Sequence, residues 1–247
     1  ERTIAAYRTL RNYELNLRCV DLGVAYALTG DVKYAVPVKT VLLRLAQLYP
    51  NWEHHDRWDR TGLLAVVGGW RFSQLLDEAT ELIKMASAYD LVASASCFSD
   101  ADRKTVEEGL LQYVAGLILK YQSFIDAGSN HQTWFNAALA SAGIAVGSAD
   151  LLKAAVYGEG RGLLWQLEHS VTDDGLWREG SNAYHFYALS AIQQTLDAAK
   201  RAGWMFADHA RLKSLWLGPI LLTYPDGSMP VFNDSDPANI RNYTGFY

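Results

Sequence analysis

The sequence predicts an all-α fold, an incomplete (α/α) toroid built from antiparallel helix hairpins. Apolar residues recur at helical spacing along most of the chain, and short turns rich in Gly and Asp separate the helical segments. Consecutive helices joined by short turns pack as antiparallel neighbours. The sequence shows no fixed repeat, which argues against a solenoid, and its aromatic-rich loops favour a toroid whose loops converge on a central cleft.

Roughly eight helices are expected, and several of their ends carry sequence signals. Thr29-Gly30 stops the first helix, while Asp31 caps the second, which breaks at Pro50. Ser99 caps the fourth. The helices are expected at about residues 3–28, 32–49, 72–95, 100–124, 131–147, 149–170, 181–202 and 205–223.

The last part of the chain departs from the helical pattern. Residues 1–223 are expected to form the toroid domain. Residues 224–247 predict a turn, a short extended run and a second turn, as in a segment that connects to a β-domain outside this sequence. The chain also begins within a helical pattern and ends abruptly, which is typical of a fragment or a trimmed domain.

Composition excludes several classes of protein. The 247 residues are half hydrophobic, and the net charge of −5 comes from 22 basic and 27 acidic residues, with the basic ones dispersed. A nucleic-acid-binding protein would concentrate basic residues on one face. No apolar run approaches the length of a membrane span. Cys19 and Cys97 lie in apolar helical patterns, which favours buried thiols over a disulfide.

The segment between the second and third helices, residues 51–60, is both polar and aromatic. It contains two tryptophans, Trp52 and Trp58. Two interpretations stay open: a loop folded back on the core with its indole rings, or a rim that stacks on a ligand. A metal site is not favoured at His54-His55, because adjacent side chains diverge and no further Cys or His lies at ligand spacing.

A first polar segment precedes the fifth helix. Ser129 or Asn130 can serve as its N-cap, which is a structural role. Capping does not explain why His131, Gln132 and Trp134 follow at once. Asn130 and Trp134 are four residues apart and share a helix face, and a helix N-terminus favours an anion such as a carboxylate.

A second polar segment begins with the turn at residues 173–175 and reaches Ser181, a candidate N-cap. Between the turn and the cap lie a ring, a cation and a carboxylate: Trp177, Arg178 and Glu179. Tyr184 and Tyr187 are three apart and face the same way, while His185 points to one side. An aromatic stripe on a helix is more often core than active site, and Tyr187 fits that interpretation.

These segments resemble the heparinase II/III-like and alginate-lyase polysaccharide lyases, whose α/α toroid is followed by an antiparallel β-sandwich. Asn130 and Tyr184 are 54 residues apart, a separation typical of the family's carboxylate-neutralising Asn/His and its catalytic Tyr. The resemblance rests on Asn-His-Gln-Thr-Trp at 130–134, Asp-Gly-Leu-Trp-Arg-Glu-Gly-Ser at 174–181, Tyr-His-Phe-Tyr at 184–187 and Pro-Val-Phe-Asn-Asp-Ser-Asp at 230–236.

The resemblance implies β-elimination at a uronic acid, in which the C5 proton is removed and the 4-O-linked sugar leaves. Donors must neutralise the carboxylate and stabilise the enolate-like intermediate. Asn130, helped by His131, is expected in that role, and Tyr184 as the acid and possible base. A tyrosine base needs nearby positive charge or hydrogen bonds, since its free pKa is about 10; Arg178, His185 and His131 are the candidates.

The resemblance also implies contacts with the glycan. Glu179 is expected to orient one of the cations or to contact the substrate. The remaining substrate contacts are expected from rings that stack on sugars and amides that bind hydroxyls: Trp134, Trp177, Tyr187, Gln132, Asn182 and Asn233. No cofactor is identified, although a structural metal in a β-domain is compatible with the family. The family implies an acidic polysaccharide or oligosaccharide as partner and a periplasmic or secreted location.

Two other functions stay open. A toroid glycoside hydrolase would need two carboxylates across the scissile bond, for which Asp174 with Glu179, or Glu179 with Asp234, are candidates. A non-catalytic glycan-binding toroid would need neither. The sequence leaves open which glycan is cut, whether heparan-like or alginate-like.

Overall fold

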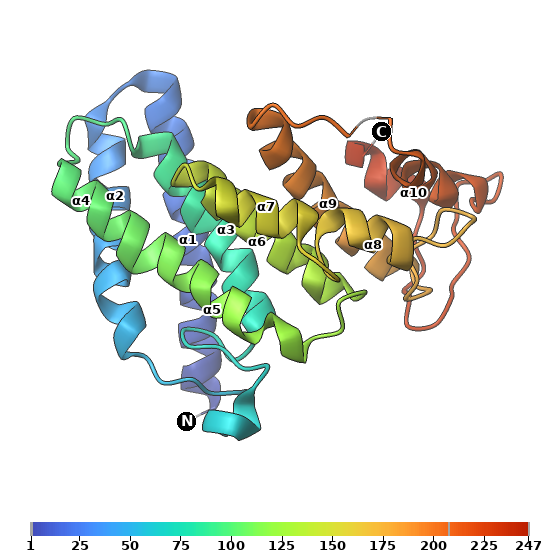
Figure 1. Ribbon diagram of the computed structural model, residues 1–247, viewed down its shortest axis with the longest axis horizontal. Coiled ribbons are helices and arrows are strands. Elements are labelled where there is room, and N and C mark those ends of the chain that lie inside the picture. Colours follow the sequence, from blue (N-terminus) through green and yellow to red (C-terminus); the bar gives the residue numbers. More distant parts are fainter. Residues whose placement is uncertain (1, 207, 247) are drawn as a thin grey trace. The chain divides into compact units, whose positions relative to one another are not determined.

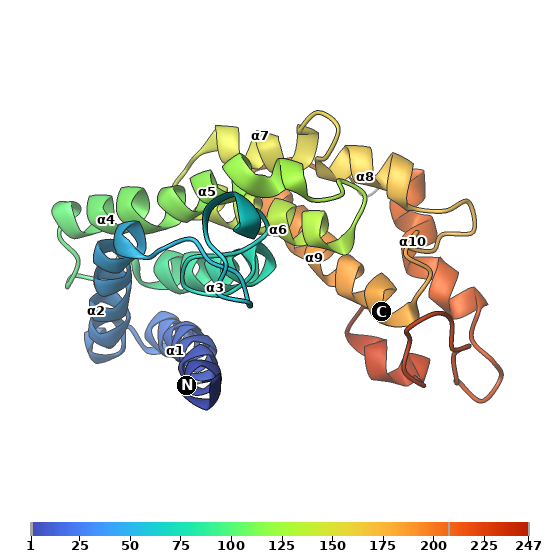
Figure 2. The same cartoon turned by 90° about the horizontal axis from the view of Figure 1, so that it is seen from below.

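The computed structural model describes residues 2–206 and 208–246; for residues 2 and 63 it describes the backbone but not the side chain. This part of the chain is helical, with isolated β-bridges and no strand (Figures 1 and 2). The α-helices are α1 Arg2–Thr29, α2 Val32–Leu48, α3 Leu75–Val92, α4 Asp100–Val106, α5 Tyr113–Tyr121, α6 Asn130–Ala145, α7 Ala149–Tyr157, α8 Leu163–Ser170, α9 Asn182–Arg201 and α10 Ala210–Leu221.

The predicted helix ends are confirmed where a side chain caps them. Asp31 accepts a hydrogen bond from the backbone N–H of Lys33 at the start of α2. Ser99 and Asp102 form a reciprocal capping box at the start of α4. Ser181 accepts from the backbone N–H of Tyr184 at the start of α9. Each of these three helices therefore begins where the sequence predicts.

Three predicted helices differ from the structure in their extent or continuity. The continuous helix expected over 149–170 is two helices, α7 and α8, because residues 158–162 form a glycine-rich turn in which Gly160 adopts a φ of +70°. The last helix begins at Ala210 rather than at 205. The helix expected over 100–124 is interrupted by a π-helical turn, Glu107–Gln112, between α4 and α5.

The described chain forms two compact units, one up to residue 124 together with 141–151, and the other over 125–140 together with the residues from 152 onward. The domain boundary expected at residue 223 stays a prediction. In the first unit α1, α2 and α3 pack against one another (Figure 1). The buried carboxylate of Glu78 on α3 accepts the Tyr49 hydroxyl at 2.7 Å and the backbone N–H groups of residues 70–72 at 2.6–2.9 Å.

The loop at residues 51–60 packs one of its two tryptophans and exposes the other, while its interpretation as a rim that stacks on a ligand stays a prediction. Trp52 folds back, with its ring 4.8 Å from that of Tyr49. Trp58 is 59% exposed and lies within 4.3 and 4.6 Å of the guanidinium groups of Arg57 and Arg60. One tryptophan is therefore packed on its neighbours, and the other is presented to solvent.

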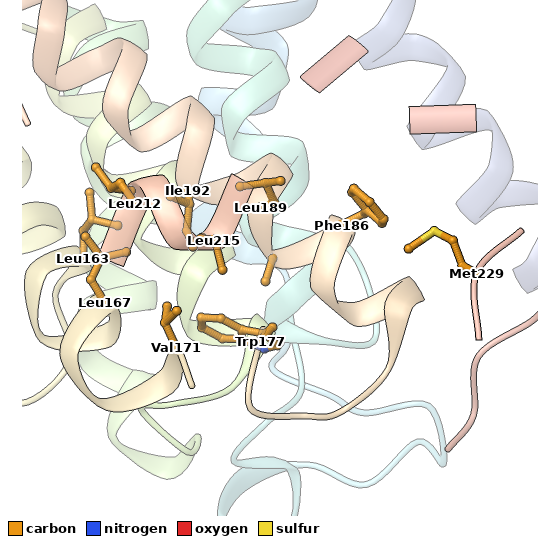
Figure 3. Close-up of a cluster of buried hydrophobic side chains, with 11 residues drawn as sticks. Leu163, Leu167, Val171, Trp177, Phe186, Leu189, Ile192, Leu212, Leu215 and Met229 are labelled. Carbon is orange, nitrogen blue, oxygen red and sulfur yellow. The ribbon is translucent and has the colours of Figure 1, made fainter. Parts of the chain in front are cut away.

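The second unit contains the core that supports the polar segments. Trp177 lies beside Val171, its partner in a β-bridge, and both contact side chains of α8, α9 and α10 (Figure 3). The buried hydrophobic side chains labelled there are Leu163, Leu167, Val171, Trp177, Phe186, Leu189, Ile192, Leu212, Leu215 and Met229. Within the described ranges, no helix has both the length and the apolar character needed to cross a membrane.

Candidate active site

The first polar segment and the second meet at one carboxylate. Asn130 is the first residue of α6 and is 4% exposed. Its backbone N–H donates to Oε2 of Glu179 at 3.1 Å, and its side-chain Nδ2 lies 3.0 Å from each carboxylate oxygen of Glu179. The Asn130 side chain thus bonds across to the second segment, 49 residues further along the chain.

The rest of the first turn of α6 divides between a partly exposed side and a buried one. His131 is half-buried. Gln132 is fully buried and belongs to an amide network: its Oε1 accepts from Arg161 at 2.9 Å and its Nε2 donates to Asn136 at 3.1 Å. Asn136 in turn donates to Gln166 at 3.0 Å. The expectation that Gln132 binds a sugar hydroxyl is therefore corrected, because its side chain lies inside this network.

Trp134 and Tyr187 form an aromatic pair. Their ring centroids are 4.8 Å apart, with the planes inclined by 44°. Trp134 is half-buried and Tyr187 is partly exposed. The buried indole N–H of Trp134 has no hydrogen-bond acceptor among the described residues. The pair keeps the features of a sugar-stacking contact, which stays a prediction for both residues.

Trp177 is not placed for sugar stacking. Its side chain is 1% exposed because both ring faces lie in the hydrophobic core of the second unit. The indole N–H donates to Oε2 of Glu179 at 2.6 Å. The structure thus gives Trp177 a different role from the predicted one, as a buried and fixed donor to Glu179.

His185 is likewise structural rather than exposed to substrate. Its Nδ1 accepts the backbone N–H of Trp177 at 3.0 Å, and its Nε2 donates to the carbonyl of Leu215 at 3.1 Å. Burial lowers the pKa of His185 to about 4, so the ring is neutral at pH 7. The predicted role of His185 as a positive charge for Tyr184 is therefore wrong.

Arg178 is engaged by another acid. Its guanidinium forms an ion pair with Asp126 in the turn before α6. Gly128 makes the close approach possible, because a Cβ there would lie 2.2 Å from Nη1 of Arg178. Arg178 therefore links the two polar segments a second time, instead of serving as the expected cation beside Tyr184.

A C-terminal segment, residues 230–235, is tied to the start of α9. The backbone N–H of Asn182 donates to the buried hydroxyl of Ser235 at 2.8 Å, and that hydroxyl donates to Ser181 at 2.9 Å. The side-chain amide of Asn182 donates to the carbonyl of Pro230 at 2.6 Å. Asn233 has a φ of +49° and donates to the carbonyl of Gly180 at 2.8 Å. We refer to these residues as the 230–235 latch.

The latch brings a carboxylate to Tyr184. The phenol of Tyr184 donates a hydrogen bond to Asp234, and the negative charge of Asp234, followed by that of Glu179, raises the pKa of Tyr184 above its usual value. The charges that face this phenol are therefore acidic, in contrast to the expected cations. Tyr184 remains protonated at neutral pH and is suited to give a proton rather than to take one.

A cavity of about 430 Å³ lies between the latch and the second polar segment. It is lined by residues that include Trp177, Asn182, His185 and Asn233. Four of the predicted substrate residues therefore border one cavity, although the side chains of Trp177 and His185 are buried, at 1% and 2% exposure. No group of three or more His, Cys, Asp or Glu side chains that could hold a metal occurs within the described residues.

Comparison with known proteins places this arrangement in a family. The model of the family described as alginate lyase matches residues 6–213. The chain belongs to the alginate lyase family.

Two curated relatives are similar to this chain in sequence. It is 29% identical over 195 residues to an alginate lyase of Stenotrophomonas maltophilia, covering 77% of this chain and 25% of that protein. It is 28% identical over 189 residues to an exo-oligoalginate lyase of Saccharophagus degradans, covering 74% of this chain and 23% of that protein. The chain therefore spans about a quarter of the length of the curated relatives it matches.

Solved structures show the same fold at lower sequence identity. Alginate lyase A1-III from Sphingomonas species A1 aligns with a TM-score of 0.63 and 17% identity, over 84% of this chain and 58% of that one. A variant of A1-III complexed with a tetrasaccharide aligns with a TM-score of 0.61 and 16% identity, over 83% of this chain and 55% of that one. Heparinase III aligns with a TM-score of 0.58 and 18% identity, over 93% of this chain and 35% of that one. These similarities confirm the predicted all-α class of the toroid enzymes.

Sequence reasoning missed the latch. Ser235 and Asn182 make its central hydrogen bonds, yet they lie 53 residues apart and follow no periodic pattern. Asp234 was considered only as a hydrolase carboxylate, not as the partner of Tyr184. The available signal was the Pro-Val-Phe-Asn-Asp-Ser-Asp stretch at 230–236, which marks the family without revealing where it binds.

The latch gives a testable expectation. Ser235→Ala removes the acceptor of the Asn182 N–H and the partner of the Ser181 hydroxyl, and an unsatisfied buried donor costs about 1–3 kcal/mol. Hydrogen exchange at the Asn182 amide should accelerate by about 10-fold or more. Ser228→Ala is the control, because the Ser228 hydroxyl bonds only to Asp226 within its own turn. Equal exchange at Asn182 in both variants would contradict the latch.

Proposed function

We propose that the protein cleaves a uronate-containing polysaccharide or oligosaccharide by β-elimination. The observation that carries the proposal is that Asn130, His131 and Tyr184, in a chain of the alginate lyase family, belong to two segments that Glu179 and Arg178 hold together. An alginate-like glycan is our first choice, since both curated relatives act on alginate by name. A heparan-like glycan is second, through the similarity to heparinase III.

In this proposal Asn130 neutralises the substrate carboxylate, and its neighbour His131 faces the C5 proton. An ionised carboxylate opposes removal of the neighbouring C5 proton, so the enolate-like intermediate needs fixed donors. Asn130 is buried and its rotamer is held, which satisfies the requirement that such donors be preorganised. The N-terminus of α6, where both residues lie, adds a favourable field for an anion.

Tyr184 acts as the acid. The carboxylates of Asp234 and Glu179 raise its pKa, so the phenol carries its proton at neutral pH and can deliver it to the leaving O4 oxygen. Our candidate for the base that takes the C5 proton is His131, a half-buried imidazole beside Asn130. A structural metal in a β-domain stays a prediction.

The hydrolase alternative receives less support from the same side chains. Three N–H donors engage Glu179, and Asp234 accepts from Tyr184. Asp174 accepts from the Thr172 hydroxyl within its own turn. A hydrolase needs one of its two carboxyl groups protonated as an acid. We retain the periplasmic or secreted location and the acidic glycan partner as parts of the proposal.

Replacing the proposed acid tests the function. Tyr184→Phe should lower kcat on alginate oligosaccharides by about 10²–10⁴-fold, the usual contribution of a general acid. Asn130→Ala should lower kcat by about 10²–10³-fold with a smaller rise in KM. Ultraviolet absorbance of the unsaturated uronate product measures both. A hydrolase would instead release reducing ends without this absorbance.

The control for this series is Tyr224→Phe, at an exposed tyrosine in the same unit. It should retain wild-type turnover. Near-normal turnover by Tyr184→Phe would overturn the assignment of the acid.

The pH dependence tests the effect of Asp234 on Tyr184. A negative neighbour disfavours the phenolate, so Asp234→Asn should lower the pKa of Tyr184. Activity that needs the protonated phenol is present below this pKa and is lost above it. The alkaline limb of kcat/KM should therefore move to lower pH in Asp234→Asn, and phenolate absorbance should report the same shift. Asp236→Asn is the matched control. A shift of the alkaline limb in both variants, or in neither, would contradict the proposed effect of Asp234 on Tyr184.

A further inference from the structure

Glu179 is the point at which donors from two distant parts of the second unit converge. The backbone N–H and the Nδ2 of Asn130 reach it from α6 at 3.0–3.1 Å, and the indole N–H of Trp177 reaches it at 2.6 Å from the connection before α9. Its side chain is only half-buried, but both partners are buried, at 4% and 1% exposure. The Glu179 carboxylate is therefore held in place by buried, immobile donors.

This carboxylate determines which way the Asn130 amide faces. Two carboxylate oxygens accept hydrogen bonds and cannot donate them, so the amino group of Asn130 must face Glu179 and its carbonyl must face away. Reversing the amide would place its oxygen against the two carboxylate oxygens. The two N–H bonds of the amino group diverge, so one of them points at the Glu179 carboxylate and the other points away from it. The Asn130 side chain is therefore restricted to one orientation before any substrate binds, with one N–H left as a donor.

The charge of Glu179 is compensated where it lies. The backbone N–H of Asn130 lies in the first turn of α6, a helix of 16 residues, where it has no acceptor within the helix and donates to Glu179 instead. Helix N-termini also stabilise anions. The indole N–H is a second donor, immobilised because the Trp177 ring lies in the hydrophobic core. With its lone pairs engaged by these donors, Glu179 is a poor general acid or base and a good anchor.

We propose that Glu179 is a positioning residue for the elimination: it engages one N–H of the Asn130 amide and so directs the second N–H of the same Nδ2 to the uronate carboxylate, without contacting the reacting atoms. This inference rests on the proposed function. It replaces the earlier expectation that Glu179 contacts the substrate. It also gives Trp177 a part in the site, as the core residue that fixes Glu179.

The test compares Glu179→Gln, Glu179→Ala and Trp177→Phe with the wild-type protein. Glu179→Gln keeps the side-chain shape but turns an amino group toward the Asn130 amide, so kcat should fall by about 100-fold, the effect of a misplaced reacting group, with KM changed far less. In Glu179→Ala, kcat should fall by the same factor. Trp177→Phe keeps the carboxylate beside Asn130 and should lose about 10-fold. Asp173→Asn is the control: Asp173 carries the same charge in the same connection, but its side chain is 98% exposed and pairs with Arg211.

A second measurement is independent of turnover. In ¹⁵N-labelled protein the side-chain amide signals of Asn130, assigned with Asn130→Ala, and the indole signal of Trp177 should shift in Glu179→Gln and stay in place in Asp173→Asn. If the wild-type protein cleaves no uronate glycan while these signals shift, the positioning contact is supported and the proposed function fails. If the wild-type protein is active and Glu179→Gln matches Asp173→Asn in kcat, the inference is overturned and the function stands. Unchanged Asn130 signals in Glu179→Gln overturn the inference whatever the activity.

Discussion

Two polar segments of this chain, separated by about 50 residues, are joined by a carboxylate at the N-terminus of α6 and by a neighbouring ion pair. Glu179 binds the backbone and the side chain of Asn130, while Arg178 binds Asp126 one turn earlier. Gln166 of α8 also holds the loop before α6, since it donates to the carbonyl of Ala127 at 2.9 Å. Because the loop before α6 has no regular structure of its own, these contacts determine where Asn130 lies.

The candidate site places two carboxylates beside the residues that are proposed to act on an acidic substrate. Glu179 and Asp234 would repel a uronate if their charges were free. Glu179 is instead engaged by three N–H donors, one of them at a helix N-terminus, and Asp234 accepts from a phenol. Each carboxylate thus acts mainly on its protein partner: one orients an amide, and the other keeps a tyrosine protonated. The same two charges that argue against a tyrosine base support a tyrosine acid.

The sequence was sufficient for local features of the fold and insufficient for contacts between distant segments. Apolar spacing and capping residues predicted the starts of α2, α4 and α9, because caps act within a few residues. Apolar positions recur on both sides of the glycine-rich stretch 158–162, and so the spacing alone did not reveal the break between α7 and α8. Periodicity measures amphipathicity and is insensitive to a turn that keeps the register of the apolar positions.

The same distinction explains the site. The sequence singled out Asn130, His131 and Tyr184 because caps and core packing left them unexplained. It also assigned Trp177, His185 and Gln132 to the substrate, although burial and hydrogen bonds commit these side chains to the protein. Residue type alone does not distinguish a polar group that faces a cleft from one satisfied in the interior, since both require the same donors and acceptors.

The most direct measurement of the central claim is a crystal structure of the Tyr184→Phe protein with an alginate oligosaccharide bound. The account predicts that one uronate carboxylate lies about 3 Å from Nδ2 of Asn130 and accepts one of its N–H groups, with Glu179 still accepting the other and the glycosidic oxygen facing residue 184. A glycan bound with its carboxylate away from Asn130, or a Glu179 side chain that turns from Asn130 to contact the sugar, would contradict it.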